Sequence, residues 1–223
     1  VIGVTGTLGN ENSIKIFKDH YRLDTIEVPR HRMNLRTDFP MILCNTTEER
    51  NNYICQEIVY CHRLEYPVLV VFKSLDDIDK LRCDLINTHK IDKSQISVFK
   101  GTDKSENDRS QIEENSGKPG SITIGTNFCG RGISIKCTSK PLHVIVAYYS
   151  DDKRAMNQVI GRAGRNGYPG SSRIICLKQE KYCPSSENDE QSTKELLSDF
   201  KIKKDKQAEF IQDLKDSYPW VFH

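Results

Sequence analysis

The sequence predicts a three-layer α/β domain with a mostly parallel sheet, and two observations support this fold class. Short apolar runs of strand length alternate with longer stretches in which apolar residues recur at helical spacing. Connections of that length join strands that pair in parallel through right-handed crossovers. With 223 residues, of which 36% are hydrophobic, the chain can bury one core of this kind. We expect that core within residues 1–178.

Seven segments of the chain have the length and the apolar or β-branched content of strands. In chain order they are Thr25–Val28, Met41–Cys44, Val68–Phe72, Ile96–Phe99, Ile122–Gly125, Leu142–Tyr148 and Arg173–Leu177.

Four segments between these strands predict helices. They are Glu48–Arg63, a segment from a cap at Ser74 to about Asn87, Lys104–Asn115, and Asp151–Gly164 with Ser150 or Asp151 as its cap. Two apolar stripes are expected to face the core, namely Ile54, Ile58, Val59 and Leu64 in the first helix and Leu75, Ile78, Leu81 and Leu85 in the second.

Residues 179–223 leave this pattern. Gln179–Ser192 is rich in Ser, Glu, Asp and Asn, which predicts a polar linker. Thr193–Tyr218 predicts an amphipathic helix with apolar residues at helical spacing. We expect this helix to dock on its own domain, and a helix that binds a partner is the alternative.

Composition argues against several functions. A net charge of +2 does not suggest a strongly basic nucleic-acid binder. The longest apolar runs, near Val68–Phe72 and Val144–Tyr149, are far too short to span a bilayer. None of the eight cysteines forms a C-x-x-C pair. We therefore expect buried reduced thiols of an intracellular protein, and no metal site.

Residues 157–167, Asn-Gln-Val-Ile-Gly-Arg-Ala-Gly-Arg-Asn-Gly, carry the strongest functional signal. On a helix, Gln158, Arg162 and Arg165 would share one face. Gly161 and Gly164 would each cost about 1 kcal/mol there, which indicates close approach of a ligand or a neighbouring domain. Two guanidinium groups beside small residues suit a polyphosphate. The alternative is a solvated basic helix end before an Asn-Gly turn.

A second segment joins a strand to a glycine-containing loop. Ser121–Asn127 predicts a buried strand, and the loop that follows contains Gly130-Arg131-Gly132. Ligands of parallel sheets bind at the carboxyl ends of strands. The two glycines let the backbone turn sharply and present N–H groups to an anion. Together with the later Gly-Arg-x-Gly-Arg sequence, this loop indicates a phosphate site.

These two segments resemble motifs V and VI of SecA, the protein-translocating ATPase, a branch of the superfamily-two helicase-like motors. Residues 121–136 resemble motif V and residues 157–172 resemble motif VI. Four more blocks follow the family's order, namely motif III at Val4–Thr7, the Pro-Thr-Asn-Arg connector at Val28–Pro40 with Arg36 and Asp38, the motif IV strand at Tyr66–Val71, and the turn at Gly167–Ser172. The resemblance covers roughly residues 1–178 and implies a second RecA-like motor domain of the P-loop NTPase superfamily.

The resemblance implies an ATP site divided between two domains. In the family, the first RecA-like domain carries the phosphate-binding loop and the acidic pair that holds Mg²⁺. This chain has no G-x-x-x-x-G-K-[ST] sequence. We therefore expect an excised second domain that shares ATP with a first domain, leaves Mg²⁺ to that domain and does not hydrolyse ATP alone.

The resemblance also implies roles for residues. Arg162 and Arg165 would be the catalytic arginines, with Arg165 the better candidate for an arginine finger. The residues implied to contact the nucleotide are Thr126, Asn127, Gly130, Arg131, Gly132, Ser134 and Gln158. Thr5 and Thr7 would relay closure between the domains. The implied partners are the first RecA-like domain, an unfolded polypeptide and a membrane translocon, in a cytoplasmic protein with peripheral membrane association; nucleic acid is not expected.

Four positions depart from the family's pattern. Ser134 stands in place of Asp, Phe128-Cys129 in place of Met-Ala, Met156 in place of Asp and Ile160 in place of Arg. A serine can bond a ribose hydroxyl but cannot pair with an arginine, so hydrolysis is expected to be slow, altered or lost. The richness in Asn, Lys, Ile and Cys is unlike a bacterial translocase and favours a eukaryotic source.

Two alternative functions stay open at this point. One is a non-catalytic interaction module derived from SecA, which Ser134 favours. The other is the C-terminal domain of a DEAD-box nucleic-acid helicase. Such helicases usually carry His-Arg-x-Gly-Arg, whereas this chain has Val159-Ile160 before Gly161-Arg162.

Overall fold

The computed structural model of the chain describes residues 11–26, 28, 32–99, 106–126, 135–137, 139–150 and 152–179. Two units divide the chain, residues 1–183 and 184–223, and every described residue belongs to the first unit. The predicted linker, from residue 180 onward, and the predicted C-terminal helix lie outside the described residues.

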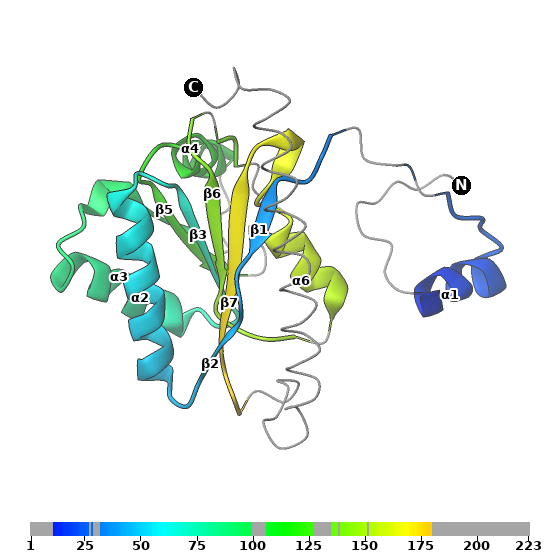
Figure 1. Cartoon of the computed structure of the whole chain (residues 1–223), viewed down its shortest axis with the longest axis horizontal. Helices are drawn as coiled ribbons and strands as arrows, with labels where there is room; N and C mark the ends of the chain where they lie inside the picture. Colours follow the sequence, from blue (N-terminus) through cyan, green and yellow to red (C-terminus); the bar gives the residue numbers. More distant parts are fainter. Residues whose placement is uncertain are drawn as a thin grey trace, which may run out of the picture. The chain divides into compact units, whose positions relative to one another are not determined.

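Seven parallel strands form the sheet in the described part of the chain (Figure 1). They are β1 (Arg36–Asp38), β2 (Ile42–Cys44), β3 (Val68–Phe72), β4 (Ile96–Phe99), β5 (Ile122–Thr126), β6 (Leu142–Val146) and β7 (Gly170–Leu177). Their spatial order is β1-β7-β6-β3-β5-β4, and β2 pairs with the second half of β7. The parallel pairing confirms the predicted fold class.

Helices cover both faces of this sheet. They are α2 (Thr47–Arg63), α3 (Asp76–Asn87), α4 (Glu106–Ser116) and α6 (Lys153–Ile160); a further helix, α1 (Glu11–Tyr21), precedes β1 in the sequence, and two 3₁₀ turns are η1 (Lys93–Gln95) and η2 (Arg165–Gly167). All of β3 is buried, and its alternate side chains enter two cores. Val68, Val70 and Phe72 pack with α2 and α3, whereas Leu69 and Val71 pack in the core that α6 covers (Figure 1). The result is the expected three-layer arrangement.

The strand predictions are confirmed except at Thr25–Val28. Thr25, Ile26 and Val28 have no regular secondary structure, and Ile26 and Val28 are 89% and 82% exposed. A β-branched run forms a strand only where a neighbouring surface accepts its side chains. In contrast, β1 has the sequence Arg-Thr-Asp, which carries no apolar signal, and its pairing with β7 makes it a strand.

The predicted helices α2, α3 and α4 are confirmed, with corrections at their ends. Leu64 and Leu75 were expected to face the core but are 39% and 41% exposed. Both lie at helix caps, Leu64 at the C-cap of α2 and Leu75 at the N-cap of α3. The cap position of α3 is Leu75 instead of Ser74, although the Ser74 hydroxyl accepts a 3.4 Å hydrogen bond from the backbone N–H of Asp76.

Buried thiols occur as the sequence predicts. Cys44, Cys55, Cys61 and Cys176 are buried, whereas Cys83 is exposed. Burial raises the pKa of Cys55 to about 11 and that of Cys61 to about 12, so both thiols stay protonated at neutral pH. Among the described helices, none combines the length and the apolar character that crossing a bilayer requires.

Candidate functional site

The helix α6 leads to the predicted arginines but is shorter than the sequence suggests. Its N-cap is Asp152, whose carboxylate accepts hydrogen bonds from the backbone N–H groups of Arg154 (2.9 Å) and Ala155 (3.2 Å). Capping by Ser150 or Asp151 is therefore wrong. The helix ends at Ile160, with Gly161 as its C-cap, so the predicted end at Gly164 is also wrong. Gly164 has a φ of 71°, which no continuing α-helix permits.

This early end separates the three polar residues that a longer helix would align. Gln158 lies on α6, Arg162 lies in the turn after it, and Arg165 begins η2. Arg162 is 6% exposed, whereas Arg165 is exposed and its Nε donates to the carbonyl of Gly161 over 3.2 Å. The expectation of one shared helix face is wrong, and only Arg165 of the two arginines faces solvent.

Gly164 is required by packing inside the domain. A Cβ at this position would lie 2.8 Å from Cβ of Arg36 and 2.9 Å from Oδ1 of Asn34. A Cβ on Gly170 would meet the backbone N of Gly164 at 2.5 Å. The turn after α6 thus presses against the start of β1 and of β7. The sequence predicts close approach of a ligand or another domain at Gly164. The structure instead places Asn34, just before β1, and Arg36, the first residue of β1, against it.

A groove of about 730 Å³ lies where this turn meets that segment. Its lining comes from Arg32, Met33, Asn34, Arg36, Gly161, Ala163, Gly164, Arg165, Asn166, Gly167 and Tyr168. Arg32 donates from Nη1 to the carbonyl of Asn166 over 2.7 Å. The groove therefore combines the predicted motif VI residues with the predicted connector, which lies about 130 residues earlier in the sequence.

The donor set of the groove suits an anion and not a metal ion. Three of its lining residues are arginines, and none of the lining residues named above is Asp or Glu. Guanidinium groups bind phosphate through paired hydrogen bonds, whereas Mg²⁺ needs carboxylate oxygens. The described residues thus fit the phosphates of a nucleotide and supply no Mg²⁺ ligands in this groove.

Thr126 ends β5, at the carboxyl edge where ligands of parallel sheets bind. Its Oγ1 is buried and has no hydrogen-bond partner in the described part of the chain. Further on, Ile135 is buried, and Gly117 packs so closely on the carbonyl of Lys136 that no Cβ would fit. The other predicted residues of this loop, together with those of motif III, lie outside the described residues, namely Asn127, Gly130, Arg131, Gly132, Ser134, Thr5 and Thr7.

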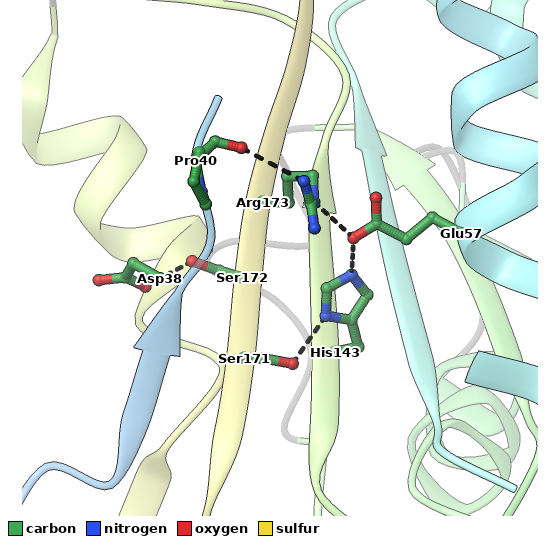
Figure 2. Close-up of polar contacts among 7 residues, drawn as sticks. All are labelled: Asp38, Pro40, Glu57, His143, Ser171, Ser172 and Arg173. Carbon is green, nitrogen blue, oxygen red and sulfur yellow. Dashed lines mark hydrogen bonds and ion pairs between the residues drawn. The ribbon is translucent and has the colours of Figure 1, made fainter. Parts of the chain in front are cut away.

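A polar network beside the groove was not signalled by the sequence (Figure 2). The Glu57 carboxylate on α2 accepts hydrogen bonds from Nε of Arg173 (2.8 Å) and binds Nε2 of His143 (2.8 Å). His143 also binds the hydroxyl of Ser171 over 2.7 Å and is 2% exposed. These contacts join α2, β6 and β7, and no local pattern could connect residues so far apart in the chain.

The network continues to the groove through β1. Asp38 accepts a hydrogen bond from the hydroxyl of Ser172 on β7 (Figure 2). Arg36 donates to both carboxylate oxygens of Asp38, from Nε over 2.6 Å and from Nη2 over 2.8 Å. Arg173 reaches the carbonyl of Pro40. Arg36, Asp38 and Pro40 belong to the predicted connector, and the structure shows that they fasten it to the sheet.

Arg50 is, like Arg162, a buried arginine, and it contacts the chain at the end of β6. Arg50 on α2 is 4% exposed and pairs with Asp77 over 2.8 Å. It also donates to the carbonyl of Ala147 over 3.3 Å and lies 5.4 Å from the ring centre of Phe72. Because Ala147 directly follows β6, these contacts tie α2 to the carboxyl end of β6.

Comparison with known proteins identifies the family of the chain. A model of the SecA P-loop domain matches residues 33–152. The protein translocase subunit SecA of Desulforapulum autotrophicum is 33% identical over 177 residues, 77% of this chain and 20% of that protein. The SecA subunit of Cytophaga hutchinsonii is 35% identical over 178 residues, 78% of this chain and 15% of that protein. The chain thus spans at most about a fifth of the length of these curated relatives.

A solved structure shows the same fold. S. cerevisiae Dbp5 bound to RNA and ADP BeF3 matches with a TM-score of 0.55 at 14% identity, over 76% of this chain and 43% of that chain. At this identity the likeness concerns the fold alone, which is the RecA-like arrangement of a parallel sheet with flanking helices. The family match over residues 33–152 and the identity above 30% over three quarters of the chain lead to one conclusion: the chain belongs to the SecA family.

Proposed function

We propose that the chain is the second motor domain of a SecA-like ATPase and completes an ATP site whose other half lies on a first RecA-like domain. One observation carries the proposal: Arg165 stands exposed in a cationic groove, held by the Gly161 carbonyl at the turn after α6. A facing domain could present a nucleotide to this side chain. ATP hydrolysis there would drive polypeptide translocation or remodelling.

For ATP hydrolysis the protein must supply positive charge near the γ-phosphate, and it need not form a covalent bond to the substrate. In phosphoryl transfer, negative charge spreads over the equatorial oxygens of the γ-phosphate. An arginine supplied from a second domain stabilises that charge and contributes about 10³–10⁵ to the rate in related machines. Arg165 is a permanent cation with donors in a planar fork, which suits this role at any physiological pH.

Arg162 has a different role in this proposal. It is 6% exposed, and a buried guanidinium beneath the turn cannot reach a nucleotide on another domain without rearrangement. We assign to Arg162 the support of the turn that presents Arg165. Gln158 on α6 and Thr126 at the end of β5 remain candidates for nucleotide contact, as do the loop residues Asn127, Gly130, Arg131, Gly132 and Ser134.

The other partners are inferred from the relatives, which are protein translocase subunits SecA. We propose an extended polypeptide as the substrate and a membrane translocon as the docking partner of the complete motor, in the cytoplasm with peripheral membrane association. Mg²⁺ would be bound by the first motor domain, because the groove residues present no carboxylate.

Steady-state ATP hydrolysis by a protein that carries this chain together with its first motor domain tests the proposal. Arg165→Ala should lower kcat by about 10³ or more. Arg63→Ala, which removes an exposed arginine at the end of α2, is the matched control and should leave kcat unchanged. Equal turnover by both variants would exclude Arg165 as the finger. If the two-domain protein without substitutions is folded but does not hydrolyse ATP, the result would instead favour a non-catalytic interaction module.

A further inference from the structure

The groove contains a second exposed arginine, Arg32, which belongs to the predicted connector but has no role assigned so far. Arg32 and Arg165 are both held by backbone carbonyls of the same turn, Arg32 by Asn166 at 2.7 Å and Arg165 by Gly161 at 3.2 Å. Both side chains are exposed, and both line the groove of about 730 Å³. They come from opposite ends of the domain's sequence, so only the fold brings them together.

The charges of this pair are not compensated inside the groove. Arg36, the third arginine of the lining, forms a bidentate ion pair with Asp38. Neither Arg32 nor Arg165 forms an ion pair with any residue in the described part of the chain. The two positive charges repel each other, and a bound anion offsets this repulsion because it attracts both guanidinium groups.

The geometry of the donors identifies the anion. A guanidinium has five N–H donors, and the described carbonyl contact of each of these two residues uses one of them. The remaining donors can bind several oxygens at once, as a phosphoryl group provides. The carbonyl contacts hold both side chains before the ligand arrives, which lowers the entropic cost of binding.

We propose that Arg32 acts with Arg165 on the same phosphoryl group, so that the predicted connector and motif VI form one two-arginine anion site. This inference rests on the proposed function, because it adds a second residue to the phosphate site assigned there. Free tripolyphosphate and the phosphates of ATP share the chemistry that the site would recognise.

Binding of inorganic tripolyphosphate to the ¹⁵N-labelled chain tests the inference by NMR. The Nε–Hε signals of Arg32 and Arg165 should shift together along one saturation curve, and this observation needs no variant. Arg32→Gln and Arg165→Gln should each weaken binding about tenfold, since each removes charge-assisted hydrogen bonds. Arg63→Gln, the exposed arginine of α2, should bind as the unmodified chain does. ATP in place of tripolyphosphate should shift the same two signals.

Three results would overturn it: no binding of tripolyphosphate, no shift of the Arg32 signal, or equal affinity of the Arg32→Gln and Arg63→Gln variants. Arg32→Lys keeps the charge but loses the fork, and its affinity should fall between those of the unmodified chain and Arg32→Gln. If Arg165→Gln weakens binding while Arg32→Gln does not, only this inference fails. If neither variant weakens binding, the proposed phosphate site fails as well.

Discussion

Replacing Gly164 by alanine should distort the turn that presents Arg165. The residue has a φ of +71°, where an L-residue pays about 1–2 kcal/mol. The new Cβ would also lie 2.8 Å from Cβ of Arg36, which sits next to the backbone and cannot swing aside. Overpacking of this kind costs about 1–3 kcal/mol. The free energy of unfolding should therefore fall by about 2–5 kcal/mol in total.

Gly120 supplies a matched control for this change. Its φ is +70°, nearly that of Gly164, but the nearest atom to a Cβ there is Nδ1 of His62 at 3.4 Å, an ordinary contact. Gly120→Ala should thus cost only the conformational term of about 1–2 kcal/mol. Urea unfolding followed by circular dichroism measures both. If Gly164→Ala is no more destabilising than Gly120→Ala, the inferred crowding between the turn and Arg36 is refuted.

Two further predictions concern the buried groups. Glu57→Ala removes the carboxylate between His143 and Arg173 and leaves the buried His143 ring without its acceptor, which should lower the free energy of unfolding by about 1–3 kcal/mol. Glu114→Ala, which breaks an exposed pair with Lys118, should cost under about 1 kcal/mol, and equal losses in the two urea titrations would contradict the reasoning. Iodoacetamide at pH 8.5 should label the exposed Cys83 and spare Cys55, Cys61 and Cys137, whose pKa values burial raises to about 11, 12 and 11, as peptide mass spectrometry would show. Because unfolded thiols ionise near 9.0 and these three do not, their contribution to stability is complete below pH 9 and is lost as pH rises toward 11–12.

Local sequence patterns were enough to predict the layers of this domain. The uninterrupted apolar run Val68–Phe72 is the fully buried β3, and the helical periodicity of residues 48–63 and 76–87 corresponds to α2 and α3. Periodicity succeeds here because it reports which face of a single element is apolar. It failed at Thr25–Val28, where β-branched residues have no strand beside them.

The residues of the candidate site could be named from the sequence, but their arrangement could not. Gly-Arg-Ala-Gly-Arg marks the turn, yet only the structure shows that the helix stops at Ile160 and that Gly164, with its positive φ, packs against Arg36. That stop buries Arg162 and exposes Arg165.

The sequence by itself determined the fold class, the family and the presence of paired arginines. Tertiary structure alone decided that Arg32 and Arg165 line one groove, and that Glu57, His143 and Arg173 meet between α2, β6 and β7. The physical reason is distance along the chain: these partners lie 30 to about 130 residues apart, so their contacts depend on strand order and close packing, which no local pattern encodes.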